Sequence, residues 1–419
     1  MPDSQTNPIL PSDLAALLRR VRARTLALVA PLSVEDMAVQ SMPDASPVKW
    51  HLAHTTWFFE RFILIPHGGA APFNSGWDSL FNSYYETLGP RYPRPARGLL
   101  TRPALDAVLE WRAHVDQALE RLLQAEPAPE LASLILLGLN HEQQHQELIQ
   151  TDVKHLQAQN PLRLPATTRP RGAIPPLGWI DHPGGLMEIG HRGPGFAFDI
   201  EGPRHHVWLS PFQLADRPVC NGEWLRFMAD GGYASPRHWL SDGWAAVQRE
   251  SWEAPLYWYH GEDGRWWHFT LEGCRPVDPA EPVCHLSHYE ADAYARWAGL
   301  RLPTEMEWEA AMAAHFNPGT PGQEEGEGGI ARHPAPISGR ETGRAVWEWT
   351  ASAYLPYPGY RPAAGAVGEY NGKFMSGQMV LRGASVATPP GHSRASYRNF
   401  FPAAARWQFS GLRLARHNC

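Results

Sequence analysis

The sequence predicts an α+β protein of two domains, a helical bundle followed by a mixed domain with little regular structure. The chain of 419 residues is too long for one typical hydrophobic core. Apolar residues recur at helical spacing up to residue 160, whereas short strand candidates among Gly, Pro and Trp prevail after residue 179. The stretch between carries five prolines, which is typical of a stiff linker. We therefore expect domains at 1–160 and 180–419, joined by a linker at 161–179.

We expect four helices in the first domain. The first begins near Ser12, and the second begins at Pro47, because proline is tolerated in the first turn of a helix. The third spans 103–123, and the fourth surrounds the run His141–His145. Four helices of this length predict an up-and-down bundle, in which inward side chains from facing helices can form a metal site.

The second domain shows weaker patterns. Strands are expected at 207–209, 379–382 and 411–415, helices at 221–228 and 288–298, and a loop at 323–329. The long stretches between them are rich in turn-forming residues and predict a domain in which irregular segments form much of the structure.

Composition argues against several classes of partner. The net charge of −6, with 37 basic and 43 acidic residues, gives no reason to expect nucleic acid or an anionic membrane. No apolar run reaches membrane-spanning length, and the N-terminus lacks the basic and apolar regions of a signal peptide. Four widely spaced cysteines suit reduced thiols. We expect a cytoplasmic enzyme, whose oligomeric state does not follow from the sequence.

The run His141-Glu-Gln-Gln-His145 is the most informative motif. Histidines four residues apart lie on one face of a helix, where both imidazoles can bind one metal ion. The run also matches the zinc-protease pattern, in which Glu142 would act as general base. A polar helix turn with one hydrogen-bonded core histidine is the plainer interpretation. We favour a metal site, because both histidines share a face and further histidines, His51 and His54, lie upstream.

Motifs in both halves are similar to those of known families. The first half resembles a DinB-type bundle in Trp50-His-Leu-Ala-His54 and in the spacing His141-x-x-x-His145-x-Glu147. The second half resembles the sulfatase-modifying-factor, or formylglycine-generating, fold, a variant of the C-type lectin fold. The matching motifs are Arg301–Glu309, Val346–Thr350 and Leu381–Ser385. A fusion of two such domains resembles the hercynine oxygenases, which are iron-dependent sulfoxide synthases of ergothioneine biosynthesis.

This resemblance implies a non-haem Fe(II) site formed by His54, His141 and His145. The third ligand is placed at His54 because it matches the last histidine of the family's upstream motif. His51, three residues earlier, is an alternative that spacing alone does not exclude. Three neutral imidazoles would leave positions open for O₂ and substrate. Glu142 would then be a surface or supporting carboxylate.

The resemblance also implies the substrates. Hercynine, the betaine of histidine, would receive a bond to sulfur at the imidazole carbon between its two nitrogens. Its trimethylammonium group cannot be hydrogen-bonded, so aromatic faces must hold it. The positions that match the family's substrate contacts are Gln144, Phe400 and Phe401. Asn399, next to Phe400, can hydrogen-bond a carboxylate or an imidazole. Arg91 and Arg94, in a loop stiffened by prolines, are candidates for binding the carboxylate of the sulfur donor.

Tyr84 and Tyr85 match the tyrosine pair of the branch that uses free cysteine rather than γ-glutamylcysteine. One of these phenols is expected to deliver a proton during the oxygen chemistry, and we favour Tyr85. The runs Tyr397–Pro402 and Arg406–Phe409 are similar to the same branch. Phe401 lies where the γ-glutamylcysteine branch carries an acidic residue, which favours a compact or sugar-bearing donor.

Several positions depart from the family's pattern, among them Ala384 and Val386 in the last motif and Ile200. They indicate a divergent subgroup such as the selenoneine synthases, which join selenium from a selenosugar to hercynine. We place a cysteine-type sulfur donor first and a selenosugar second. A copper-binding formylglycine-generating enzyme is disfavoured, because no cysteine lies between Cys284 and Cys419. A non-catalytic lectin-like binding protein is the remaining alternative, but it leaves the histidine helix without a role.

Overall fold

Residues 11–166, 172–319 and 330–418 are described by a computed structural model of the protein, which divides into two compact units. The first unit contains the chain up to Gln159 together with Arg192–Phe198 and Arg361–Lys373. The second contains Asn160–His191, Asp199–Tyr360 and the chain from Phe374 onward. Two short segments of the C-terminal half thus belong to the helical unit. Residues 167–171 of the expected linker and the expected loop at 323–329 lie outside the described residues.

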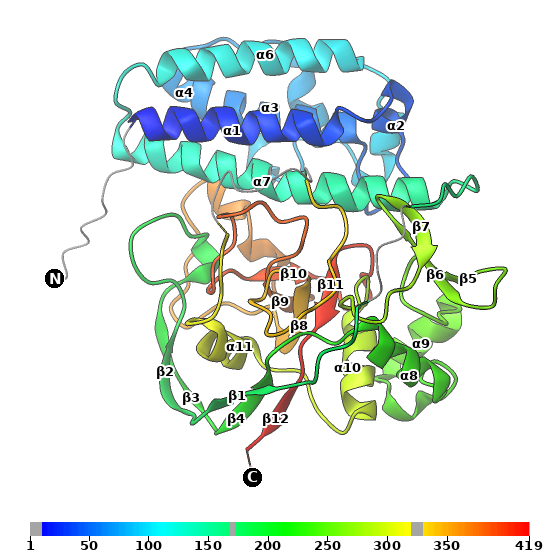
Figure 1. The fold of residues 1–419 in the computed structure, drawn as a ribbon. Helices are drawn as coiled ribbons and strands as arrows, with labels where there is room; N and C mark the ends of the chain where they lie inside the picture. The colour runs from blue at the N-terminus through cyan, green and yellow to red at the C-terminus, as the bar shows by residue number, and fades with distance from the viewer. Residues whose placement is uncertain (1–10, 167–171, 320–329, 419) are drawn as a thin grey trace. The chain divides into compact units, whose positions relative to one another are not determined.

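Within the described residues, four long helices form the first unit (Figure 1): α1 (Pro11–Val29), α3 (Val48–Phe59), α6 (Leu105–Leu122) and α7 (Pro129–Ala158). The predicted bundle is therefore confirmed. Shorter helical segments connect these helices: α2 (Val34–Ala38), η1 (Glu60–Leu64), α4 (Ile65–Gly68), η2 (Ser75–Trp77), α5 (Asp78–Phe81), η3 (Glu86–Leu88) and η4 (Arg94–Leu99). The segment η1 is a π-helical turn that directly continues α3.

Helix α3 is the central helix of this unit, because every one of its residues is buried. It packs against both α6 and α7. Gly138 of α7 permits a close approach of the two helices, since a Cβ atom at this position would lie only 2.7 Å from the ring of Phe59 in α3. Side chains of α3 and α7 are therefore close enough to meet at one ion.

A buried ion cluster fixes the rotation of α7 about its axis. The carboxylate of Glu142 has no exposed surface and accepts hydrogen bonds from Arg22 (2.8 Å) and Thr25 (2.6 Å) of α1. Arg112 of α6 donates to the same carboxylate. Burial alone would raise the pKa of Glu142, but the Arg112 and Arg22 guanidiniums lower it from 4.5 to about 2. One turn further along α7, Gln146 donates to the backbone of α1 (2.8 Å).

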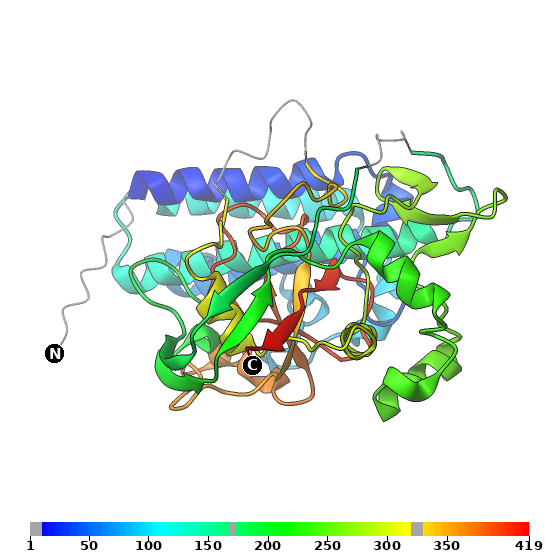
Figure 2. The ribbon, with the colours of Figure 1, turned by 60° about the horizontal axis from the view of Figure 1, so that its bottom comes forward.

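The second unit contains four small sheets among the described residues. β1 (Trp179–His182), β4 (Phe212–Ala215) and β12 (Ala415–His417) form an antiparallel sheet, drawn as green and red arrows side by side in Figure 2. A second sheet contains β10 (Asn399–Phe401), β9 (Met379–Gly383), β8 (Trp347–Ala353) and β11 (Ser410–Leu412). β2 (Gly185–Ile189) pairs with β3 (His205–Leu209), and the last sheet has the order β5 (Trp258–His260), β6 (Trp266–Thr270) and β7 (Gly273–Pro276).

Helices complete this unit: α8 (Asn221–Ala229), α9 (Ser241–Glu250), α10 (His288–Trp297) and α11 (Glu305–Met312). Capping boxes at Ser287 and Thr304 begin α10 and α11, where a side-chain oxygen binds an otherwise unpaired backbone N–H. Trp308 of α11 is buried against Phe212 and Leu214 of β4. The predicted α+β class is confirmed. Among the described helices, none combines the length and apolarity that crossing a membrane requires.

The expected strand at 411–415 is wrong in one respect. Two strands lie there, β11 parallel to β8 and β12 antiparallel to β4. Between them Arg413 is completely buried, and its guanidinium binds Glu348 at 2.8 Å. This buried ion pair anchors the chain where it passes from one sheet to another, and the local sequence pattern does not indicate such a change.

Replacing Glu142 with Ala is expected to destabilise the helical unit by about 3–5 kcal/mol, because Arg22 and Arg112 would keep buried charges without their partner. Urea unfolding followed by far-UV circular dichroism measures the loss. The control Glu110→Ala, on the exposed side of α6, should stay within about 0.5 kcal/mol of the unchanged protein. The pKa of Glu142 is depressed by folding, so its contribution is complete above pH 4.5 and is lost as the pH falls towards about 2. Equal effects of both variants would contradict this role.

Candidate metal centre

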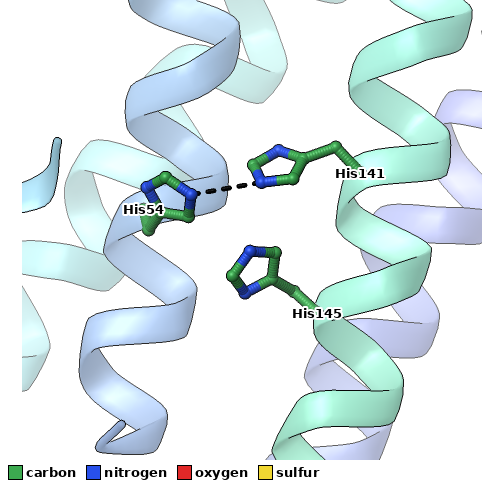
Figure 3. Close-up of side chains that lie close together, drawn as sticks. All are labelled: His54, His141 and His145. Atoms are coloured by element: carbon green, nitrogen blue, oxygen red, sulfur yellow. Dashed lines mark hydrogen bonds between the residues drawn. The ribbon is translucent and has the colours of Figure 1, made fainter. Parts of the chain in front are cut away.

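Among the described residues of the first unit, three histidines from two helices converge (Figure 3). His54 lies on α3, and His141 and His145 lie one turn apart on α7. All three are buried, and the nitrogens that could bind an ion lie within 4.8 Å of one another. The Nε2 atoms of His54 and His141 are 3.1 Å apart. The structure thus brings together the three residues that the family resemblance implies.

Hydrogen bonds orient two of these imidazoles. Nδ1 of His54 lies 2.6 Å from the carbonyl oxygen of Phe81, which can only accept, so His54 carries its proton on Nδ1. Nδ1 of His145 lies 2.8 Å from Nδ1 of His51, whose Nε2 lies 3.1 Å from the Asp152 carboxylate. The matching set of tautomers has His51 donating to Asp152 and accepting from His145. Both His54 and His145 then turn an unprotonated Nε2 toward the cluster.

Burial keeps the three imidazoles neutral. It is the largest cause that lowers the pKa of His141 to about 3 and the pKa values of His54 and His145 well below the ordinary value. Aromatic rings form part of the apolar environment of these imidazoles. Phe58 packs on His141 with ring centres 4.7 Å apart, and Trp50 stacks on His54 at 4.6 Å. A metal ion binds the neutral form of histidine, so no proton has to be displaced from these imidazoles at neutral pH.

The arrangement fits a divalent metal ion. Two nitrogens that each lie about 2.1 Å from one ion are roughly 3 Å apart, which agrees with the 3.1 Å between His54 and His141. Three imidazoles on two packed helices occupy one side of a coordination sphere and leave its other positions for small ligands. This donor set suits first-row transition metals in general.

The sequence did not decide the roles of His51 and Glu142. His51, the alternative third ligand, contacts the back of the His145 imidazole through its Nδ1. Glu142 is completely buried between Arg22 and Arg112, so the expectation of a surface position is wrong. Two guanidiniums offset the cost of burying this charge. Held in this way, Glu142 is not available as the general base that the zinc-protease pattern requires.

Tyr370 is a residue of this site that sequence analysis missed. It belongs to the segment Arg361–Lys373 of the first unit, just after the turn η7 (Ala366–Glu369). Its hydroxyl donates to the side-chain oxygen of Gln144, and its ring centre lies 5.5 Å from that of His141. Gln144, an expected hercynine contact, therefore lies beside the histidines. No local motif marks Tyr370, because its partner is 226 positions away in the chain.

Tyr84 and Tyr85 lie in the loop between α5 and η3. Tyr85 is completely buried against Trp57 and Phe62, and Tyr84 is half-buried with its ring centre 4.7 Å from that of Tyr85. Burial, and then the neighbouring Tyr84 and Tyr370, raise the pKa of Tyr85 well above its ordinary value. The phenol therefore keeps its proton at neutral pH and can serve as a proton donor.

The arginines of the following loop differ in burial. Arg91 is half exposed and pairs with Glu86 at 2.6 Å, whereas Arg94 is exposed and donates to a backbone carbonyl. Arg97, which sequence analysis did not single out, is buried with its guanidinium 3.3 Å above the centre of the Trp50 ring. Burial lowers the pKa of Arg97, but a guanidinium keeps its charge at neutral pH. A buried cation of this kind is well suited to bind an anionic group.

The remaining expected substrate contacts, Asn399, Phe400 and Phe401, form strand β10 of the second unit and are all half-buried. Phe400 stacks on Tyr354 with ring centres 4.1 Å apart, and Phe401 meets Trp407 edge-on at 5.8 Å. The Asn399 side chain accepts a hydrogen bond from the backbone N–H of Phe400 (2.9 Å). Tyr354 therefore covers one face of the Phe400 ring.

Comparisons with known proteins agree with this architecture. Residues 17–149 match the DinB superfamily, and residues 168–325 match the sulfatase-modifying factor enzyme 1-like domain. A hercynine oxygenase of Mycobacterium tuberculosis is 33% identical over 437 residues, which cover 97% of this chain and 99% of the relative. The chain belongs to the hercynine oxygenase family.

A second hercynine oxygenase, from Mycolicibacterium smegmatis, is 33% identical over 96% of this chain and 98% of its own length. A formylglycine-generating enzyme of Thermomonospora curvata is 35% identical, but over 32% of this chain and 48% of its own. Similarity to the hercynine oxygenases therefore spans almost the whole chain, whereas similarity to the second enzyme concerns one part of it. The predicted fusion of a DinB-like bundle with a C-type-lectin-like, sulfatase-modifying-factor domain is confirmed.

Changing His54 to Ala is expected to abolish the binding of a metal ion at this cluster, because the two imidazoles of α7 alone form an incomplete site. His51→Ala should weaken binding by about 10–100-fold, since it removes only the support of His145. Anaerobic Fe(II) titration followed by metal analysis measures both effects, with His67→Ala, exposed on α4, as control. Full binding by His54→Ala together with complete loss in His51→Ala would reverse the ligand assignment.

Proposed function

We propose that this protein is a non-haem iron, O₂-dependent enzyme that joins the sulfur of a cysteine-type donor to the imidazole C2 of hercynine. The product would be the sulfoxide of ergothioneine biosynthesis. The single observation that carries the proposal is the buried cluster of His54, His141 and His145, found in a chain similar over almost its whole length to hercynine oxygenases. Neutral imidazoles and open coordination positions support Fe(II) as the ion. When bound, the iron would supply the redox chemistry that lets O₂ react with the organic substrates.

The chain's own side chains would bind and orient hercynine. Gln144 can hydrogen-bond the imidazole or the carboxylate, and Tyr370, which binds its side-chain oxygen, would hold that amide in one orientation. Asn399 offers a second amide. Phe400, stacked on Tyr354, offers an aromatic face to the trimethylammonium group, an interaction worth about 1–2 kcal/mol when water is excluded.

The donor would be held by its carboxylate and selected by its size. Arg91 and Arg94, in the loop after the tyrosine pair, are the candidates for binding this carboxylate. The burial of Arg97 over Trp50 makes it a third candidate. Phe401 is apolar and packs on Trp407, which offers nothing to the charged groups of a γ-glutamyl dipeptide. This supports a compact donor such as cysteine.

A selenoneine synthase, which would form a carbon–selenium bond between hercynine and a selenosugar, is the second candidate function. The observation that favours it is the departure from the family's pattern at Ala384, Val386 and Ile200. Ala384 and Ile200 are buried, so these differences alter packing and not only the surface. The three-histidine cluster and the tyrosine pair serve either donor equally. We rank the selenium reaction second, because the relatives that are similar over almost the whole chain are hercynine oxygenases.

The test is anaerobic reconstitution of the full chain with Fe(II), followed by hercynine, O₂ and one donor at a time, with mass analysis of the products. Cysteine is expected to give a hercynine–cysteine sulfoxide, γ-glutamylcysteine should give at most a small fraction of that turnover, and His54→Ala serves as the control without iron. Product from the selenosugar alone would replace the sulfur reaction by the selenium reaction. Absence of product with every donor would favour a non-catalytic binding protein and contradict the proposal.

The phenols near the histidines should control how O₂ is used. Tyr85→Phe is expected to leave Fe(II) and hercynine binding unchanged, but to divert O₂ from bond formation toward oxidation of the donor, because a proton source is lost. We expect coupling to be about 10²–10⁴-fold slower in this variant. The ratio of coupled product to oxidised donor measures the diversion of O₂. Tyr84→Phe and Tyr370→Phe are the matched comparisons. Unchanged coupling in Tyr85→Phe with a loss in either comparison would move the proton donor to that residue.

A further inference from the structure

The second unit contains another buried group of residues with metal-binding side chains. His268 lies on β6, Glu281 follows β7, and His333 lies in the segment described from residue 330 onward. Their exposed fractions are 3%, 0% and 4%, and their potential ligand atoms lie within 4.8 Å of one another. None of these residues takes part in the function proposed above, and together they form a cluster of two imidazoles and one carboxylate.

The fold brings the three side chains together through backbone pairing. His268 is directly opposite Arg275 in the antiparallel pair of β6 and β7, so both side chains project from the same face. Arg275 then donates to Oε1 of Glu281 at 2.7 Å. The segment that carries His333 is joined to the same turn by the hydrogen bond from Ile337 N–H to the carbonyl of residue 280 (2.9 Å).

The distances within the cluster are those of neighbouring metal ligands rather than of hydrogen bonds. Oε2 of Glu281 lies 3.5 Å from Nε2 of His333 and 3.9 Å from Nε2 of His268. Hydrogen bonds of this type span about 2.7–3.2 Å. Two ligand atoms that bind one tetrahedral zinc ion at about 2.0–2.1 Å are roughly 3.3–3.4 Å apart. The pair Glu281–His333 matches the second value, and the pair Glu281–His268 exceeds it by a margin that a small side-chain shift closes.

One carboxylate oxygen of the cluster is buried without a hydrogen bond among the described residues. Oε2 of Glu281 is buried and accepts no hydrogen bond from any described residue. A buried carboxylate oxygen in this condition is costly, whereas its companion Oε1 is bound by Arg275. In metal sites the oxygen that does not bind the ion is commonly held by such a donor. The carboxylate is therefore oriented with one oxygen toward Arg275 and the other toward the two imidazoles.

We propose that His268, Glu281 and His333 bind a zinc ion through Nε2, Oε2 and Nε2, as a structural site of the second unit. Two imidazoles and one carboxylate are a donor set that zinc accepts readily. Arg275 places the carboxylate and is not itself a ligand. Because the cluster is buried and joins β6, the turn after β7 and the segment after residue 330, the ion cross-links three parts of the chain that the sequence separates.

The competing explanation is a purely hydrogen-bonded cluster, in which one histidine is protonated and pairs with Glu281. A protonated imidazole would draw its N–H to hydrogen-bond distance of Oε2, as Arg275 does at Oε1 with 2.7 Å. Neither histidine does so, since the distances are 3.5 Å and 3.9 Å. The geometry therefore favours an ion between the three side chains over a direct pair.

The test uses the full-length protein stripped of metal, loaded with Zn(II), dialysed and analysed for metal content. The three histidines of the first unit also accept zinc, so we expect about two equivalents in the unchanged protein and about one in His54→Ala. Glu281→Gln should also hold about one equivalent, and the combination of both changes about none. The control Glu262→Gln, exposed in the turn between β5 and β6, should keep about two equivalents.

A second measurement covers the case in which Glu281→Gln does not fold. X-ray absorption at the zinc edge of the His54→Ala protein should show two imidazoles and carboxylate oxygen around the remaining ion. Chelation should lower the melting temperature of the second unit in His54→Ala. The proposal is overturned if His54→Ala retains no zinc after dialysis, or if Glu281→Gln retains as much zinc as the unchanged protein. Neither result bears on the iron-dependent reaction, because His268, Glu281 and His333 take no part in it.

Discussion

The rotational setting of helix α7 is the constraint on which the candidate metal centre depends. Successive residues of an α-helix point about 100° apart, so Glu142 and Gln146 share one face and His141 and His145 share the next. Arg22 and Arg112 hold the Glu142 face toward α1 and α6. Buried ion pairs add little net stability, but separating their charges is expensive, so other rotations of α7 are penalised. The histidine face is thereby directed at α3, where His54 lies and where Gly138 permits a close approach.

Burial then decides where protons reside in this centre. Desolvation disfavours the charged form of every titratable group, so it lowers the pKa values of imidazoles and raises those of phenols. His141 and Tyr85 illustrate the two directions, and both side chains are neutral at neutral pH as a result. The imidazoles present lone pairs to an ion, and the phenol keeps a proton that it can give away. The relay from His145 through His51 to Asp152 fixes which nitrogen carries the remaining proton.

The helical unit is not made by the N-terminal half alone. Segments Arg192–Phe198 and Arg361–Lys373 belong to it, and they supply Phe198 and Tyr370, whose rings stack with planes 7° apart. Glu369, in the segment Arg361–Lys373, accepts hydrogen bonds from the backbone of the chain that directly follows Tyr84 and Tyr85. The two halves of the sequence therefore share the construction of one site, which explains why an isolated DinB-type motif describes it incompletely. The family relationship, in contrast, extends over nearly the whole chain.

Much of this protein could be predicted from its sequence. Helical periodicity placed the four long helices, and the spacing of His141 and His145 identified a metal-binding face, because one turn of helix relates them whatever the surroundings. Short-range patterns could not reveal that Glu142 is buried or that 411–415 is divided between two sheets. Each depends on a distant charged or packing partner, such as Arg112 for Glu142 and Glu348 for Arg413. The same holds for Tyr370 beside Gln144 and for His333 beside Glu281. The sequence by itself determined which side chains could do chemistry, whereas only the tertiary structure decided which of them meet, because contacts between distant segments depend on how the whole chain packs.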